Sequence, residues 1–246
     1  HGSIRDIIRD MNAAKRPIIL VGNGVRLSKA EEEFHKFINH VRIPVLTTWK
    51  TLDFLEEEHP LYVGRPGWVG QRGANFNQQN SDFILCIGAR LDHGQLAYQP
   101  KYFAREAVKV IVDIDQKEID KLGINVHYPI CFDAKLFLKQ LNSRLDEIKP
   151  KSSLWLDWCK RKYKEYPVCN PNHYSGKDRV NLYAFIDTLS NNLTKDSLVI
   201  PGSSGACSEV TMQAIRIPKG CRVFNTEGLG SMGFGVPAAI GGCLAS

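Results

Sequence analysis

The sequence has no long hydrophobic run and no N-terminal charged segment followed by an apolar one. Its longest uncharged stretch, residues 228–246, holds six glycines and a proline. A membrane-spanning helix needs about 20 predominantly apolar residues, and a stretch so rich in glycine does not supply them. We therefore expect neither a secretory signal peptide nor a membrane span.

Cysteine spacing typical of zinc sites is also missing. The chain has seven cysteines, an odd number, and no two of them are separated by two residues. This argues against a structural zinc site and against a disulfide framework. Cys86 and Cys131 lie within apolar runs, which predicts small buried side chains. A reducing, cytoplasmic compartment fits this cysteine usage best.

A concentrated charge of one sign is absent as well. The net charge is +6, with 24% charged and 43% hydrophobic residues, which is ordinary for a globular protein and excludes disordered and coiled-coil classes. The densest basic run, residues 160–164, is interpreted as a solvated helix face. We expect no nucleic-acid partner, because such partners usually require a more concentrated basic patch.

Short apolar runs alternate with segments of helical period through the first 150 residues. Runs of this kind are typical of strands that are buried on both faces. The alternation predicts an α/β fold: a doubly wound parallel sheet of six or nearly six strands, with helices on both faces. Ser28 followed by Glu31 predicts a capping box at the start of one of these helices. The predicted strands lie at 18–21, 43–48, 82–89 and 108–115.

The pattern divides the chain into three parts. Residues 3–150 form a nucleotide-binding-like α/β domain, and residues 151–177, which are punctuated by prolines, form an interdomain connection. Residues 178–246 begin a second α/β domain with two strand-like runs, which is too few for a complete core. We therefore expect that this second domain is truncated and that the chain is a fragment of a longer protein.

Glycines follow the first predicted strand. Ligands of parallel sheets bind beyond the carboxyl ends of the strands, so these positions are candidates for a site. Gly22-Asn23-Gly24 is explained either by a tight turn or by the close approach of a phosphate group. Leu27 replaces the third glycine of the dinucleotide fingerprint, so a nicotinamide Rossmann site is not supported.

Charged residues follow the third and fourth predicted strands. Arg90 could donate two hydrogen bonds to a diphosphate or ribose edge, or it could form an ion pair with Asp92. The segment Asp113-Ile114-Asp115 could accept hydrogen bonds from ribose hydroxyls, or Asp115 could cap the next helix. The residues alone leave these alternatives open.

The sharpest signal is the glycine-rich segment 227–241, which has five glycines in 15 residues. A glycine inside a helix costs about 1 kcal/mol relative to alanine, so close helix packing or the close approach of a cofactor must offset it. Met232 is the bulky flexible side chain on this turn. It is either a core residue or a contact to a cofactor.

The string GLGSMGFGVPAAIGG resembles the cofactor-binding turn of thiamine-diphosphate-dependent enzymes of the acetolactate synthase group. Other segments resemble the same family in the same order, over nearly the whole chain. The turn is the specific motif, and the order of the looser segments adds weight to it. These segments are RPIILVGNGV, IPVLTTW, GRPGWVGQRGANFNQQNSDFILCIGARLD, VIVDIDQKEIDK and CFDAKLFL.

The resemblance implies a lyase or transferase that decarboxylates or joins small 2-oxoacids with thiamine diphosphate and Mg²⁺, as a homodimer or homotetramer. That family has a pyrimidine-binding, a central and a diphosphate-binding domain, and this chain would be the central domain and the start of the third. The magnesium motif and the activating glutamate of the family would lie outside it. We therefore expect no catalytic and no metal-binding residue in this fragment, and no activity of the fragment alone.

The resemblance also implies roles for particular residues. Gly230 would offer its carbonyl to the aminopyrimidine ring, and Met232 would wedge between the two rings of the cofactor. The residues that would bind thiamine diphosphate are Ser203, Ser204, Gly230, Ser231 and Met232. Six residues match positions that hold FAD in synthases: Gly22, Thr48, Gly88, Arg90, Asp113 and Ile114. Other members of the family use that site for another nucleotide or leave it empty.

The sequence departs from the synthase pattern at two places. The segment 204–207 replaces a glutamine–histidine pair, which argues against acetolactate formation itself, and Cys207 is expected to be a packed thiol. Gln95 and Leu96 lie near the place of a second arginine of the FAD loop, which disfavours FAD. The alternative function is a nucleotide-binding α/β module without thiamine chemistry. An NAD-dependent deacylase ranks below it, because zinc-spaced cysteines are missing.

Overall fold

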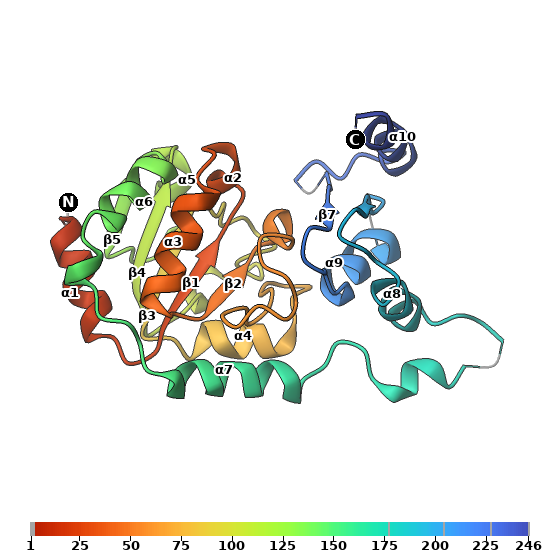
Figure 1. Ribbon diagram of the computed structural model, residues 1–246, viewed down its shortest axis with the longest axis horizontal. Helices are drawn as coiled ribbons and strands as arrows, with labels where there is room; N and C mark the ends of the chain where they lie inside the picture. The colour runs from red at the N-terminus through yellow and green to blue at the C-terminus, as the bar shows by residue number, and fades with distance from the viewer. Residues whose placement is uncertain (1–2, 177, 204, 227, 246) are drawn as a thin grey trace.

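The structure is a computed structural model that describes residues 3–176, 178–203, 205–226 and 228–245. A larger α/β unit contains the N-terminal end, and a smaller α/β unit contains the C-terminal end (Figure 1). Each unit has a cluster of buried apolar side chains, and the cluster of the smaller unit also includes Leu52 from the larger one. No helix in the described ranges is long and apolar enough to cross a membrane.

A five-stranded parallel sheet forms the centre of the larger unit, with the strand order β2-β1-β3-β4-β5. β1 and β3 are buried along their whole length, which explains their continuous apolar sequences. The segment around Tyr62 runs beside β2 and forms a parallel bridge with Val45, so it partly fills a sixth position. The predicted doubly wound sheet of nearly six strands is confirmed. The strands are β1 (Pro17–Val21), β2 (Val45–Thr47), β3 (Phe83–Ile87), β4 (Val108–Asp113) and β5 (Tyr128–Cys131).

Helices form layers on the two faces of this sheet. α3 (Glu31–Val41) leads from β1 to β2, and α4 (Arg72–Gln79) leads from β2 back past β1 to β3. Right-handed crossovers that run in opposite directions place their helices on opposite faces. α3 packs against α6 (Ala134–Asn142), and α4 packs against α7 (Ser153–Glu165). The remaining helical segments of this unit are α1 (Ile4–Ala13), α2 (Gly24–Leu27), α5 (Gln116–Asp120), η1 (Trp49–Thr51), η2 (Pro100–Tyr102) and η3 (Leu145–Glu147).

Only some of the helices in the larger unit begin with a side-chain cap. The carboxylates of Asp115 and Asp133 accept backbone hydrogen bonds at the starts of α5 and α6, as side-chain caps do. The capping box predicted from Ser28 and Glu31 is wrong. α3 begins after Ala30, which makes no side-chain cap, and the Ser28 hydroxyl instead donates to a carbonyl of the preceding helix α2.

The two cysteines predicted to be buried differ in their surroundings. Cys86 is buried in the central strand β3, and this burial raises the pKa of its thiol. Cys131 is exposed, so that prediction is wrong. Cys131 ends β5, the edge strand of the sheet, where an apolar sequence does not guarantee cover on both faces.

The smaller unit is built around the two-stranded parallel sheet of β6 (Leu198–Val199) and β7 (Arg222–Val223). Its longest helix, α10 (Gly235–Ala245), buries none of its residues. Between the units, α7 contributes Trp155 and Cys159 to the core of the larger unit, so this part of residues 151–177 packs as a helix on that unit. The other segments are α8 (Leu182–Ser190), α9 (Thr211–Ala214), η4 (Pro171–Tyr174) and the π-helical η5 (Ala206–Val210).

Candidate functional site

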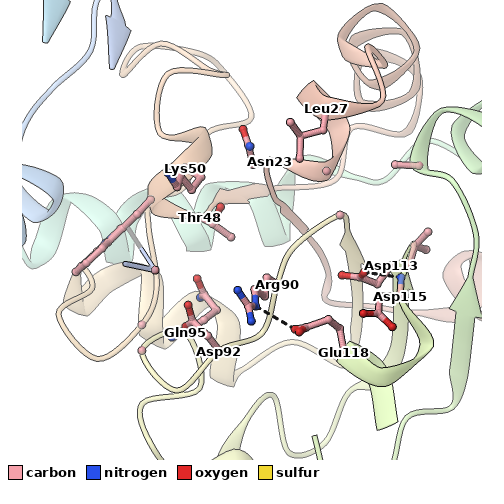
Figure 2. Close-up of a pocket in the computed structure, with 18 of the residues that line it drawn as sticks. Asn23, Leu27, Thr48, Lys50, Arg90, Asp92, Gln95, Asp113, Asp115 and Glu118 are labelled. Atoms are coloured by element: carbon pink, nitrogen blue, oxygen red, sulfur yellow. Dashed lines mark hydrogen bonds and ion pairs between the residues drawn. The ribbon is translucent and has the colours of Figure 1, made fainter. Parts of the chain in front are cut away.

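A cavity of about 890 Å³ lies at the carboxyl ends of β1, β3 and β4. β1 and β3 are neighbours in the sheet, but the chain leaves them toward opposite sides, so the cavity lies at the topological switch point where α/β sheets bind ligands. The structure brings together the positions predicted to bind a nucleotide (Figure 2). Thr48, Gly88, Arg90, Asp113 and Ile114 line the cavity, and Gly22 directly precedes the lining residues Asn23 and Gly24.

The glycines beside the cavity allow two turns to approach each other. A Cβ atom on Gly22 would lie 2.3 Å from the Cα of Ala89, and one on Gly24 would lie 2.7 Å from the Cα of Gly88. Gly24 also donates a backbone hydrogen bond of 2.9 Å to the carbonyl of Gly88. The tight-turn interpretation therefore accounts for these glycines, and the turn also forms one wall of the cavity.

Arg90 forms an ion pair that the sequence did not suggest. Its Nε atom lies 3.1 Å from Oε2 of Glu118, rather than pairing with Asp92. The hydrogen bond from Lys121, together with that from Arg90, holds the pKa of Glu118 below its usual range. The Arg90 side chain remains about two-thirds exposed, so its other nitrogen atoms can still donate to a ligand.

Carboxylates at the end of β4 are engaged in local hydrogen bonds. Asp115 caps α5, which bears out the capping alternative for that residue, and Oδ1 of Asp113 accepts the backbone N–H of Asp115 at 3.0 Å. Figure 2 shows Asp113 and Asp115 on one side of Arg90, with Gln95 and Thr48 on the other. The cavity therefore has Asp113 and Asp115 at one end, and Gln95 together with Asp92 at the other.

Two lining residues of the cavity, Glu209 and Gly228, come from the smaller unit. Lys50, which also lines the cavity, donates a hydrogen bond of 2.5 Å to the carbonyl of Asn225 across the joint between the units. Oε2 of Glu209 is buried and has no hydrogen-bond partner among the described residues. Gly228 belongs to the glycine-rich segment singled out from the sequence, whereas Lys50 and Glu209 were not predicted, because only the fold brings them to the ends of the strands.

A second missed feature is Arg65, whose side chain is 1% exposed and connects the two units. Its guanidinium donates to the backbone carbonyls of Met212 at 2.9 Å and Ile215 at 2.7 Å, where α9 ends. It also donates to the hydroxyl of Tyr62 at 2.6 Å. Burial raises the pKa of Tyr62, so this hydroxyl stays protonated at neutral pH. The cationic group of the loop 64–67 is therefore buried between the units and not exposed to solvent.

The glycine-rich turn of the smaller unit is open to solvent. Gly230 has a left-handed backbone with φ of +58°, and a Cβ on it would lie 3.5 Å from the carbonyl oxygen of Ser203, so these two predicted cofactor positions are close. Met232 is 92% exposed and Ser231 is exposed, which excludes the core interpretation of Met232 in this chain. Ser204 lies outside the described residues. Cys207 is exposed, so its predicted packing is wrong.

The larger unit has the architecture of a nucleotide-binding α/β domain, and its cavity extends to a second parallel unit with a glycine-rich turn. Residues 4–141 match the family described as "Thiamine pyrophosphate enzyme, central domain". The chain belongs to this family, and the resemblance stated from the sequence is confirmed.

Relatives match along almost the whole chain. It is 35% identical to a probable acetolactate synthase large subunit of Methanococcus aeolicus, over 98% of this chain and 42% of that protein. It is 31% identical to the acetolactate synthase isozyme 1 large subunit of Escherichia coli, over 99% of this chain and 42% of that protein. It is 30% identical to the chloroplastic acetolactate synthase 1 of Zea mays, over 99% of this chain and 38% of that protein. The chain thus spans about 40% of the length of these relatives.

Proposed function

We propose that this chain is a region of a thiamine-diphosphate-dependent enzyme that decarboxylates or joins 2-oxoacids. The observation that carries the proposal is the family match together with the likeness to acetolactate synthase large subunits over almost the whole chain. In the full-length protein, which we propose is a homodimer or homotetramer, this region would supply the central domain, residues 3–150, and the start of the diphosphate-binding domain, residues 178–246. Residues 151–177 would connect them.

The glycine-rich turn fits thiamine diphosphate in its steric properties. Gly230 and Ser203 are close together, and the large side chains on residues 228–234 are those of the exposed Leu229 and Met232 and the half-buried Phe234. Thiamine diphosphate supplies a nucleophilic carbon that adds to the carbonyl group of a 2-oxoacid. Ser203, Ser204 and Ser231 would offer hydroxyls to the cofactor, and the Gly230 carbonyl would accept a hydrogen bond from it. Met232 would hold its rings in a productive orientation.

The cavity at the switch point would bind a nucleotide, with Gly22, Thr48, Gly88, Arg90, Asp113 and Ile114 around it. Its volume lies within the range of about 300–1,000 Å³ that is common for small-molecule sites. The exposed guanidinium of Arg90 suits a phosphate group, and the Asp113 carboxylate suits ribose hydroxyls. FAD is one candidate, and another nucleotide is the alternative, because Gln95 lies where the FAD loop of synthases has an arginine.

We further propose that the chain by itself is inactive and binds thiamine diphosphate with Mg²⁺ only negligibly. The support is its share of the relatives, about 40% of their length, which leaves most of their residues unmatched. Much of the affinity for a diphosphate group comes through the metal ion. Clear saturable binding in a calorimetric titration of this chain at millimolar cofactor would contradict this part of the proposal.

The whole proposal is tested on the full-length protein that contains this chain. It is incubated with pyruvate, thiamine diphosphate and Mg²⁺, and the release of CO₂ and the formation of acetolactate are measured. We expect CO₂ release that depends on the cofactor, with or without acetolactate. A protein that binds nucleotides but releases no CO₂ from any of a panel of 2-oxoacids would support the nucleotide-binding module without thiamine chemistry instead.

A further inference from the structure

A loop of the larger unit, residues 52–61, reaches the smaller unit at two separate places. Oδ2 of Asp53 accepts the backbone N–H of Val223 at 2.9 Å. Further along the loop, the backbone N–H of Glu57 donates to the carbonyl of Ile217 at 2.9 Å. The part of the loop between these places is buried in the core of the larger unit. The two contacts are therefore anchored separately, and one can open while the other stays closed.

Glu57 does more than donate this backbone hydrogen bond. Its Oε1 atom accepts a hydrogen bond of 2.6 Å from the hydroxyl of Tyr163 on α7. Its carboxylate also places a negative charge near the buried guanidinium of Arg65, which holds the end of α9. Displacing Glu57 would therefore remove its own bond to the smaller unit and a charge that favours the buried Arg65.

His59 holds the end of this loop in place through its ring and its backbone. Its Nδ1 atom accepts the backbone N–H of Leu61 at 3.2 Å, so the neutral ring carries its hydrogen on Nε2. Its carbonyl accepts a hydrogen bond of 3.1 Å from Nζ of Lys160 on α7. A second proton would put an N–H on Nδ1 against the N–H of Leu61. It would also add a positive charge close to the ammonium group of Lys160.

His59 lies near a second histidine, His35 on α3, and both rings are half-buried. Burial is the main reason why the pKa of each ring lies below its ordinary value of about 6.5. Both rings are therefore neutral in slightly alkaline solution and take up protons in acid. The charged groups that interact with the two rings come from the loop, from α3 and its C-terminal cap, and from α7: Glu56, Glu31, Arg42 and Lys160.

We propose that residues 56–61 form an acid-sensitive latch, in which protonation of His59 and His35 frees Glu57 from the smaller unit. The contact at Asp53 persists and acts as the hinge about which this edge of the joint opens. Two positively charged rings repel each other and the cationic groups of α3 and α7, whereas the carboxylate that they share balances one charge.

The direction of the effect follows from proton binding. Burial disfavours the charged rings in the latched state, so below a pH of about 6.5 the released loop binds more protons than the latched loop. Acid therefore favours release, by at most about tenfold per histidine for each pH unit below this value. Between about pH 7.5 and 5.5, two histidines set an upper limit of about a hundredfold, and we expect about tenfold because the shared carboxylate compensates in part.

Amide hydrogen exchange of the 246-residue chain, measured by NMR at these two pH values, tests the latch. Protection factors are compared, because they are corrected for the effect of pH on the exchange chemistry itself. The Glu57 amide should lose about tenfold in protection at the lower pH. Two other amides should keep their protection: that of Val223, which is bonded to the hinge, and that of Ile19, which donates to the carbonyl of Pro44 in the central sheet.

Variants of the two rings separate the titration of these histidines from that of other groups. In the double variant His35→Gln/His59→Gln, the Glu57 amide should keep its protection at the lower pH, because glutamine takes up no proton and its side-chain oxygen can still accept a backbone N–H. His40→Gln is the matched control. His40 also lies on α3, but its ring bonds to the carbonyl of Ile148, so the loss at Glu57 should remain.

Glu56→Gln tests the proposal in the opposite direction and does not depend on the folding of the histidine variants. Removing the carboxylate that both rings share makes their charged forms less favourable in the latched state. The loss of protection at Glu57 should therefore become larger than in the unmodified chain. Glu32→Gln, an exposed position on α3, is the matched control and should leave the loss unchanged.

Several results would overturn the latch. One is a Glu57 amide that keeps its protection at the lower pH, and another is an equal loss in the double histidine variant. A loss at Val223 or Ile19 as large as that at Glu57 would show general acid unfolding instead of a latch. A smaller loss in Glu56→Gln would contradict the electrostatic argument. The latch rests on neither the proposed thiamine site nor the proposed nucleotide site, so its failure leaves both unaffected.

Discussion

Replacing Arg65 with methionine should loosen the smaller unit without unfolding the larger one. The guanidinium is buried and donates to three carbonyls at the end of α9, those of Met212, Gln213 and Ile215, as well as to the Tyr62 hydroxyl. Methionine keeps most of the length and apolar contact of the side chain, but it donates no hydrogen bond. The change therefore removes the hydrogen bonds of Arg65 and leaves the other polar contacts between the units in place.

The magnitude follows from those bonds and from the cost of burying the charge. Each hydrogen bond from a charged donor contributes about 1.5–3 kcal/mol, but burial of an arginine carries a desolvation cost that its removal relieves. Among the described residues, no carboxylate forms an ion pair with Arg65 that would be left unpaired. We expect the free energy with which α9 docks to fall by about 2–4 kcal/mol, which is less than the sum of the four hydrogen bonds.

Hydrogen exchange measured by mass spectrometry, combined with urea unfolding, checks this expectation. Trp155 and Trp158 pack on the core of the larger unit, whereas Trp49 packs on that of the smaller unit, so the fluorescence is measured in a Trp49→Phe background, where it reports on the larger unit. In Arg65→Met, amides of residues 211–217 should lose protection, while the fluorescence midpoint in urea moves little. Arg72→Met is the control, because Arg72 is exposed and its guanidinium lies over the ring of Tyr166. Equal loss of protection in both variants, or loss spread over both units, would refute the reasoning.

Three further predictions concern the turn, a histidine and the cofactor loop. Gly22→Ala should destabilise the chain by about 2 kcal/mol or more, because the added Cβ would overlap backbone atoms. Gly241 has open space around it, so Gly241→Ala should be neutral or stabilising by about 1 kcal/mol. Thermal melting of the two variants measures both effects. Partial burial lowers the pKa of His59. Just below the ordinary histidine pKa of about 6.5, the folded chain therefore binds fewer protons than the unfolded chain, and the stability falls as the pH falls through this range. Protonation also removes the Nδ1 acceptor of the Leu61 N–H, and His59→Gln should therefore reduce the loss of urea stability between about pH 7.5 and 5.5. Met232→Ala should leave the melting temperature of the chain unchanged, since the side chain is exposed. It should lower turnover of the full-length enzyme by about a hundredfold, whereas Met232→Leu should retain most of the turnover. Normal turnover of the alanine variant would contradict the wedge role.

Sequence reasoning located four of the five strands of the larger unit, β1 to β4, because these strands are largely buried, and it missed the edge strand β5. Such strands, as in Pro17–Val21 and Phe83–Ile87, must be continuously apolar, and few other structures require this. The same logic failed at Cys131, because an edge strand has the same composition but less cover. It also failed at Ser28, where the path of the chain between two consecutive helices decides the cap.

The nucleotide-site residues were predictable for a topological reason. Positions that follow different parallel strands meet at one edge of the sheet, so Thr48, Arg90 and Asp113 converge without any knowledge of side-chain contacts. Arg65 and Glu209 were not predictable in this way. Their roles depend on how the smaller unit docks against the loop 64–71, and no periodicity or spacing encodes a contact between segments almost 150 residues apart.

Directional polar contacts between the units, beside the apolar packing of Leu52, determine where one wall of the cavity lies. The side chain of Asp53 is 1% exposed and accepts hydrogen bonds from Arg26 on α2 and from the backbone of Val223 on β7. Apolar surfaces can slide past one another, whereas a buried network with fixed donors and acceptors has one favoured arrangement. Because α2 also lines the cavity, this network fixes the position of the cavity wall relative to the strand that leads into the glycine-rich turn.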